Sequence, residues 1–153
     1  MRRIFFIALI ISLLFLSLIS IFFHSQPNVL GSQRDQKKIT VNDQTFTVDV
    51  ADTDNKRVQG LSGRKNLKQN EGMLFIFPDK SIRAFWMKDM NFPLDIIWID
   101  SDTIVGFVEN APPEGANPIN RYYSPVPVDK ILELNAGTVK NLHIEKGQKI
   151  IIY

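Results

Sequence analysis

The chain has 153 residues, 44% of them hydrophobic, and it contains no cysteine. This length predicts one domain together with a short additional segment. The lack of cysteine excludes disulfide bonds, thiol catalysis and thiolate metal sites. Residues 1–38 carry five basic side chains and one acidic side chain, whereas residues 39–153 carry thirteen basic and fifteen acidic ones. The larger part of the chain is therefore slightly acidic, and its charge gives no reason to expect binding to nucleic acid.

The first 23 residues predict a transmembrane anchor. Residues 4–23 carry no charged side chain and directly follow Arg2 and Arg3. As a helix these residues would extend over about 30 Å, the thickness of the hydrocarbon core of a bilayer. The two arginines place the N-terminus in the cytoplasm and the rest of the chain outside. The alternative is a signal peptide, whose apolar segment is usually only about 7–15 residues long and whose cleavage would release a secreted protein.

Residues 24–38 are polar and predict a tether between this anchor and a single extracytoplasmic domain at residues 39–153. The domain begins with two β-type segments, at residues 39–41 and 45–50. They flank the turn-forming residues 42–44, and the second segment alternates apolar with polar side chains. This pattern predicts a β-hairpin with one buried face.

A short helix is predicted after the hairpin. Residues 52–54 have small oxygen-bearing side chains that can accept hydrogen bonds from the free N–H groups of a first helical turn. We expect Gly60 to end this helix in a left-handed conformation, with Leu61 folding back onto Val58.

The rest of the domain predicts further short strands. Strands are expected at residues 73–77, 84–87, 94–99, 104–108, 130–134 and 149–153, with turns at residues 77–80 and 100–103 and helical turns at residues 136–142. Continuous apolar runs predict strands covered on both faces, whereas residues 130–134 alternate. The proline-rich connection at residues 110–128 is of a length that is often functional. The fold class is mainly β (α+β by strict count): a small curled sheet or barrel of about eight short strands with two short helices, preceded by one transmembrane helix.

Four motifs extend over most of the predicted domain. They are VADTDNKRVQGLSGR at residues 50–64, GMLFIF at 72–77, FWMKDMNFPLDIIWID at 85–100 and ILELNAGTVKNLHIEKGQKI at 131–150. In order and spacing they resemble the family catalogued as domain of unknown function 192. The resemblance covers about residues 39–153 and implies a compact, mostly β domain of small exported or membrane-anchored prokaryotic proteins. It implies no activity, cofactor or catalytic residue.

Asp95 is the most informative single polar residue. It lies in the apolar run at residues 94–99, on the strand face that it shares with Ile97. A carboxylate between two apolar faces is costly unless it is hydrogen-bonded or paired. In a structural role, Asp95 would accept backbone N–H groups from residues 89–93, or pair with Lys88 or an arginine. In a functional role, it would form the polar floor of a ligand pocket.

Aromatic and basic side chains add further candidates for a binding site. The two tryptophans are expected in the core, although Trp86 and the tyrosine pair at residues 122–123 could stack on a flat ligand. Arg57 and Arg64 flank the Gly60 turn, where each could form a structural ion pair or bind an anion. The predicted ligand-binding residues are Arg57, Arg64, Trp86, Lys88, Asp89, Asn91, Asp95, Tyr122 and Tyr123.

Neither a metal site nor a cofactor is predicted. The domain has one histidine, His143, which we expect to be partly buried. Met73, Met87 and Met90 lie in apolar runs without a repeated methionine motif, so we expect them in the core and not as copper ligands. Residues 100–102 lack the later ligands and the glycine of a calcium loop. The sequence also lacks a nucleophile motif with a matching triad and a phosphate-binding glycine loop.

The preferred function is a membrane-anchored binding or accessory module of the cell envelope, with a groove around the turn from Lys88 to Asp95. Its expected partners are the membrane, through the N-terminal helix, and a small ligand or another envelope component. The alternative is an extracytoplasmic hydrolase that uses paired carboxylates such as Asp89 and Asp95. A scaffold for a neighbouring envelope protein is a third interpretation. The lack of a complete catalytic set favours the binding module.

Overall fold

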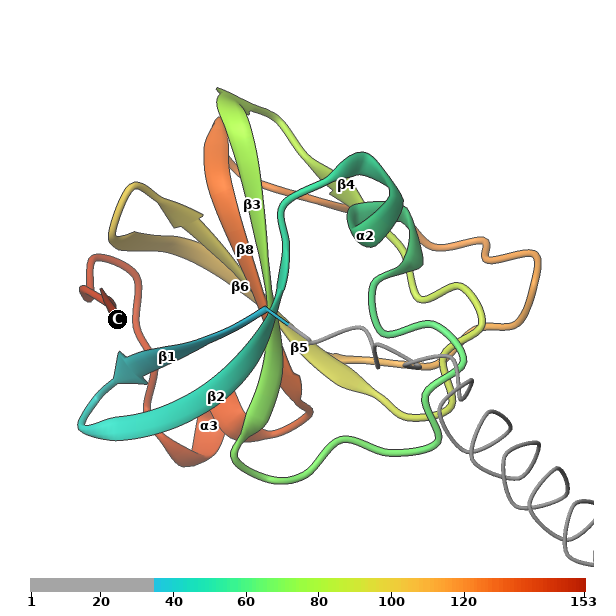
Figure 1. Cartoon of the computed structure of the whole chain (residues 1–153), viewed down its shortest axis with the longest axis horizontal. Coiled ribbons are helices and arrows are strands. Elements are labelled where there is room, and N and C mark those ends of the chain that lie inside the picture. The colour runs from blue at the N-terminus through green and yellow to red at the C-terminus, as the bar shows by residue number, and fades with distance from the viewer. Residues whose placement is uncertain (1–34) are drawn as a thin grey trace, which may run out of the picture. The chain divides into compact units, whose positions relative to one another are not determined.

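The computed structural model in Figure 1 describes residues 35–153. Within this range its strands are β1 (Gln36–Val41), β2 (Gln44–Ala51), β3 (Glu71–Ser81), β4 (Ala84–Phe85), β5 (Leu94–Asp100), β6 (Thr103–Ala111), β7 (Tyr122–Tyr123), β8 (Val128–Asn135) and β9 (Ile151–Ile152). Its helices are α2 (Asp54–Gln59) and α3 (Thr138–Asn141). The predicted anchor at residues 1–23 and most of the predicted tether lie outside the described residues. Neither described helix has the length and apolar character that a membrane span requires.

Seven of these strands form one curled sheet with the order β6-β5-β8-β3-β2-β1-β9 (Figure 1). The pair β2–β3 is parallel and the other pairs are antiparallel. The C-terminal residues form the edge strand β9 beside β1 and also contact the opposite edge strand, β6. Ile104 on β6 donates its N–H to the Gln148 carbonyl oxygen over 2.9 Å, and Tyr153 donates to the Lys38 carbonyl oxygen on β1 over 2.9 Å. The expected mainly β fold with a small curled sheet is confirmed, and the C-terminal residues cover the edge at β6.

The predicted hairpin and the start of the first helix are confirmed. Asn42 and Asp43 connect β1 to β2 with φ angles of 45° and 63°. Positive φ at both central residues is the signature of the two-residue turn that matches the twist of paired strands. Thr53 precedes α2, and its hydroxyl oxygen accepts a hydrogen bond from the Lys56 N–H over 3.4 Å.

The predicted conformation at the end of α2 is wrong. Gly60 has φ 48° and ψ −135°, and a left-handed helical residue would have a positive ψ. This region is almost restricted to glycine because any Cβ atom would clash with the backbone. The chain therefore turns sharply toward the sheet, where Leu61 is buried, while Val58 stays 71% exposed on α2.

The turn predicted at residues 77–80 is also wrong, because β3 continues through Ser81. The register between β3 and β8 shifts between Ile76 and Ser81. Pro78 lies in this irregular part, where a residue without an N–H group breaks no regular ladder. Pro78 therefore lies in an irregular part of the strand and does not end it.

The strand predicted at residues 84–87 is shorter and belongs to a different sheet. Only β4 is extended, and it pairs with β7 outside the seven-stranded sheet. Strand β7 lies within the proline-rich connection at residues 110–128. Two segments far apart in the chain thus form a small layer beside the sheet (Figure 1).

The sheet separates two apolar clusters. The first includes Leu74 on β3 and Ile97 on β5, together with side chains from β1, β6 and the C-terminal residues. Because both edges contribute to it, this cluster fills the concave face. The second includes Phe75 and Trp98 on the opposite face of the same strands, covered by residues 61–67 and 85–92. The expectation of central strands covered on both faces is therefore confirmed.

Candidate functional site

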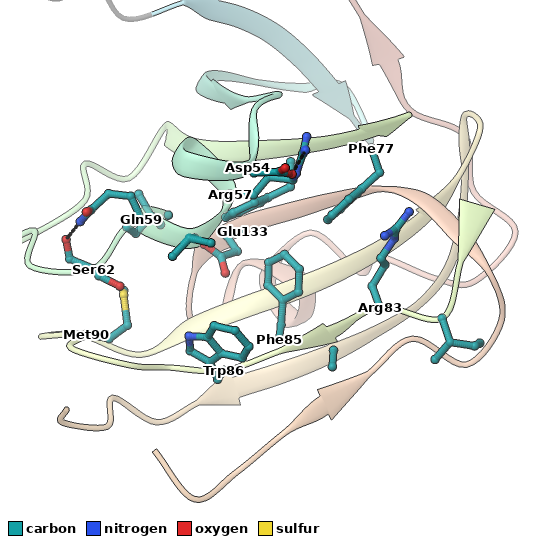
Figure 2. A pocket seen from close by; sticks show the side chains of 16 residues that line it. Asp54, Arg57, Gln59, Ser62, Phe77, Arg83, Phe85, Trp86, Met90 and Glu133 are labelled. Carbon is teal, nitrogen blue, oxygen red and sulfur yellow. Dashed lines mark hydrogen bonds and ion pairs between the residues drawn. The ribbon is translucent and has the colours of Figure 1, made fainter. Parts of the chain in front are cut away.

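A cavity of about 400 Å³ lies on the convex face of the sheet (Figure 2). One wall is α2 with the residues that follow it, and the other is the segment at residues 82–86, which contains β4. Side chains of β3 and β8 form its floor. This volume lies within the range of about 300–1,000 Å³ that is typical of small-molecule sites.

Aromatic side chains form most of the apolar lining. Phe75 and Phe77 come from β3, and Phe85 and Trp86 come from β4 and its end. The rings of Phe75 and Phe85 meet edge to face, with centroids 4.8 Å apart and planes at 84°. Phe85 makes a second edge-to-face contact with the buried Trp98, over 5.8 Å. Such pairs contribute beyond the area they bury, so Phe85 is held in one orientation.

Two arginines lie at the rim, and each is paired with a neighbouring carboxylate. Arg57 donates to Asp54 over 2.5 Å, a contact that Figure 2 shows, and Arg83 donates to Asp79 over 3.1 Å. Both guanidinium groups lie over the ring of Phe77, at 5.2 Å for Arg57 and 4.0 Å for Arg83. The positive charges at the mouth are therefore fixed by ion pairs and cation–π contacts.

Glu133 is a buried acid on the floor of the cavity. It lies on β8 between Met73 on β3 and Ile96 on β5, and it is 5% exposed. Its side chain makes no hydrogen bond or ion pair within residues 35–153. Two other side-chain atoms in this range, Arg83 Nε and Glu114 Oε2, are buried without a hydrogen-bond partner. Burial raises the pKa of Glu133 to about 8, against a smaller opposing effect of the Arg64 guanidinium. The carboxyl is therefore mostly protonated at neutral pH, and it can donate as well as accept a hydrogen bond.

Asp49 shows how the same sheet accommodates a buried acid that is paired. It faces Met73 across the parallel pair β2–β3, in the row of residues that contains Glu133. Its carboxylate accepts a hydrogen bond from Gln36 over 2.8 Å and forms an ion pair with Arg64. Of the two roles predicted for Arg64, the structure shows the structural ion pair. The nearest opposing cation is thus committed to Asp49, and Glu133 has none of its own.

Asp95 lies on the other face of the sheet and does not line this cavity. It is fully buried, and its two oxygens accept backbone N–H groups from Asn110 over 2.9 Å and from Val139 over 2.8 Å. The structural role was expected to use donors from residues 89–93. Those donors are instead supplied by the end of β6 and the start of α3, because β5 lies between β6 and β8 in the sheet. With both oxygens so engaged, the described residues give no support to the hydrolase alternative.

A groove was predicted around the turn from Lys88 to Asp95. Of the residues of this turn, only Met90 lines the cavity. Lys88 and Asp89 are exposed, and Asn91 donates from its amide to the Arg64 carbonyl oxygen over 2.8 Å. The Asn91 side chain thus links this turn to the segment that follows α2. Met90 and the other two central methionines are buried, as predicted.

The remaining aromatic candidates lie at or near the mouth. Trp86 lines the cavity and is 40% exposed, with the Arg121 guanidinium 5.1 Å from its ring centre. The prediction of a core position is therefore correct for Trp98 and wrong for Trp86, because β4 ends before Trp86. Tyr122 packs against the second apolar cluster, and burial together with Glu114 raises its pKa. The next residue in β7, Tyr123, is 61% exposed.

Glu133 was not predicted as a site residue, although the signal is present in the sequence. The segment ILEL places this acid between two leucines, the same pattern that singled out Asp95. Alternation at residues 130–134 was interpreted as one solvent-facing side. That side is covered by α2 and the residues after it, so the outward-facing acid is buried. His143, expected to be partly buried, is exposed, and no cluster of metal-binding side chains occurs in residues 35–153.

Two solved structures share this fold. A protein from Sinorhizobium meliloti 1021, described as a "putative transcription regulator", is 34% identical, with a TM-score of 0.71 over 78% of this chain and 95% of its own. A protein of unknown function from Novosphingobium aromaticivorans DSM 12444 is 28% identical, with a TM-score of 0.68 over 81% of this chain and 89% of its own. No curated protein matches the chain.

The match covers nearly the whole Sinorhizobium chain, so a domain of this kind folds and crystallises with little else attached. Residues 34–153 correspondingly form one compact unit by themselves. The family model for domain of unknown function 192, described as "Uncharacterized ACR", matches residues 37–152. The resemblance in the four motifs is thereby confirmed, and this chain belongs to the domain of unknown function 192 family.

Proposed function

We propose that this protein is a ligand-binding or accessory module of the cell envelope, anchored in the membrane by residues 1–23, and that the cavity of Figure 2 is its binding site. The observation that carries the proposal is the floor of this cavity, where a buried carboxyl has no polar partner within the described residues. Buried polar groups in folded proteins are almost always hydrogen-bonded, so a persistent exception calls for a functional explanation.

The cost of burying Glu133 supports a ligand as that explanation. An unpaired polar group in an apolar environment lowers stability, and the cavity around it is large enough to admit a partner. A ligand that bonds to the carboxyl and fills the aromatic lining would recover this cost as binding free energy. The other buried acids of the domain, Asp49 and Asp95, are satisfied by the protein itself.

The description of the Sinorhizobium protein as a regulator is not extended to this chain. Residues 39–153 carry thirteen basic and fifteen acidic side chains, which does not favour a surface for nucleic acid. The uncharged segment at residues 4–23 after two arginines supports an envelope location instead.

A thermal-shift screen tests the binding function. Residues 34–153 are screened against saccharides, peptidoglycan fragments, amino acids and amines. In the variant Val58→Trp, a large side chain at the exposed rim of the cavity should abolish the shift of any true ligand. Its matched control is Ile119→Trp, at an 88% exposed position that does not line the cavity. A shift from no compound, or shifts that persist in Val58→Trp, would refute the proposal.

A protease-accessibility assay on the full-length chain tests the location. The proposal predicts that protease added outside cells with a permeabilised outer layer digests the domain while a cytoplasmic marker stays intact. A domain that is digested only after the inner membrane is broken would contradict the extracytoplasmic orientation.

A further inference from the structure

We propose that the cavity binds a primary ammonium group on an apolar stem, with the ammonium beside the Glu133 carboxyl and the stem against the aromatic lining. This inference rests on the proposed function, because it names the ligand class for the same cavity.

The position of Glu133 is the first reason. Figure 2 shows its carboxyl between α2 and Phe85, inside the space that the lining residues enclose. An ionised carboxylate only accepts hydrogen bonds, and its strongest partners are cationic donors. Arg64, whose charge acts on Glu133, is engaged by Asp49. A cation that pairs with the ionised Glu133 carboxylate would therefore have to be supplied by a ligand.

The aromatic lining is the second reason. The protein already places its own cations on rings of this cavity, with two guanidinium groups on Phe77 and one on Trp86. Ring faces attract cations electrostatically, and the attraction is stronger where water is excluded. Phe75 and Phe85 lie deeper, and the apolar stem of a ligand would bury its surface against them.

The charges near the cavity argue against an anionic ligand. A ligand carboxylate at the floor would meet the carboxyl of Glu133, which would resist ionisation further. The arginines at the rim are already paired with Asp54 and Asp79, and Arg83 Nε is the one buried donor among the lining residues without a hydrogen-bond partner. The charged groups that line the cavity with Glu133 are Asp54 and Arg57 on α2 and Arg83 before β4, while Arg64 acts on Glu133 and is paired with Asp49 on β2.

Binding of an ammonium group should be linked to pH. The carboxyl is mostly protonated at neutral pH and must lose this proton to form an ion pair. Affinity for an ammonium ligand should therefore rise about tenfold per pH unit between pH 6 and about 8, and level off above the pKa of Glu133. A neutral ligand that accepts a hydrogen bond from the protonated carboxyl would show the opposite trend.

Three ligands with one stem and different head groups separate these cases. Isothermal titration calorimetry on residues 34–153 compares hexylammonium, hexanol and hexanoate at pH 6, 7 and 8. We expect hexylammonium to bind most tightly at pH 8, at least about tenfold better than hexanol, with release of a proton at pH 6 and 7. Hexanoate should bind weakest at every pH.

Two matched variants assign the effect to Glu133. Glu133→Gln should lower the affinity for hexylammonium about tenfold or more at pH 8 and abolish its pH dependence, while hexanol binding is retained as evidence of an intact cavity. Glu109→Gln removes an exposed glutamate outside the cavity and should change neither the affinity for hexylammonium nor its pH dependence.

The outcomes distinguish the two proposals. If Val58→Trp leaves the binding of these compounds unchanged, the cavity is not the site and both proposals fail. If none of the three compounds binds, the ammonium inference is overturned, and the thermal-shift screen decides the binding function. If hexanol or hexanoate binds as well as hexylammonium at pH 8, or Glu133→Gln retains the preference for the ammonium, the ammonium inference is overturned while the binding function stands.

Discussion

The raised pKa of Glu133 predicts that Glu133→Gln stabilises the protein at neutral pH. The folded-state pKa is about 8, above the ordinary value of 4.5. A carboxyl whose pKa is higher in the fold than in the unfolded chain leaves the stability of the fold intact below the unfolded-state pKa. As pH rises from there through the folded-state pKa, the fold loses stability because the unfolded chain gives up its proton first. Glutamine has nearly the same volume as glutamate and does not ionise. The free energy of unfolding of the variant should therefore not fall over this pH range.

The size of the effect follows from the two pKa values. At pH 7 the carboxyl is ionised in the unfolded chain and mostly protonated in the fold, so unfolding releases almost one proton. About 2.5 pH units separate neutrality from the ordinary pKa, and each unit corresponds to about 1.36 kcal/mol, which gives about 3 kcal/mol. The expected difference between variant and parent is small near pH 4 and largest above about pH 8.

Urea unfolding of residues 34–153 between pH 4 and 8 measures this difference. The free energy of unfolding of Glu133→Gln should exceed that of the parent by an amount that grows with pH, while Glu109→Gln should follow the parent throughout. A Glu133→Gln variant that is less stable than the parent at pH 7 would refute the reasoning, because the carboxyl would then have a stabilising partner in the fold.

Three further predictions concern stability and the mouth of the cavity. Asp95→Ala leaves two backbone N–H groups without an acceptor and should lower the free energy of unfolding by about 2–4 kcal/mol in urea titrations, whereas Glu109→Ala at an exposed position should change it little. Gly72→Ala would place a Cβ atom 2.6 Å from the Glu133 carbonyl oxygen and should destabilise by about 1–3 kcal/mol or more, measured as a fall in Tm. Ligand binding should shift the fluorescence emission of Trp86 at the rim, and Trp86→Phe should remove that shift.

Much of the fold could be predicted because it depends on local chemistry. The turn at Asn42 and Asp43 and the cap at Thr53 follow from hydrogen bonds and φ angles within a few residues. The errors arise where distant segments decide the conformation. The strand β3 continues beyond Pro78 because β8 pairs again at Ser81, and β4 stops early because its only partner is the short β7. Neither pairing leaves a local signal in the sequence.

The candidate site was less predictable than the fold for a related reason. Arg57 and Trp86 were predicted and do line the cavity, but the sequence pattern could not show which face of each strand another segment covers. Asp95 was correctly predicted to be a buried acid that requires hydrogen-bond donors. The same test applied to Glu133 would have identified it, had the outer face of β8 been known to lie under α2.

The two buried acids on neighbouring strands show what distinguishes a structural position from a binding position. Asp95 and Glu133 are both inaccessible, and each lies among apolar neighbours in the centre of the sheet. The fold directs two backbone N–H groups at Asp95, so the removal of that carboxylate damages the protein. It directs none at Glu133 and leaves a cavity of about 400 Å³ above it. Among the three buried acids of the described residues, Glu133 is the one to which the protein supplies no hydrogen bond, and a site of this kind is where a ligand gains most by supplying the missing partner.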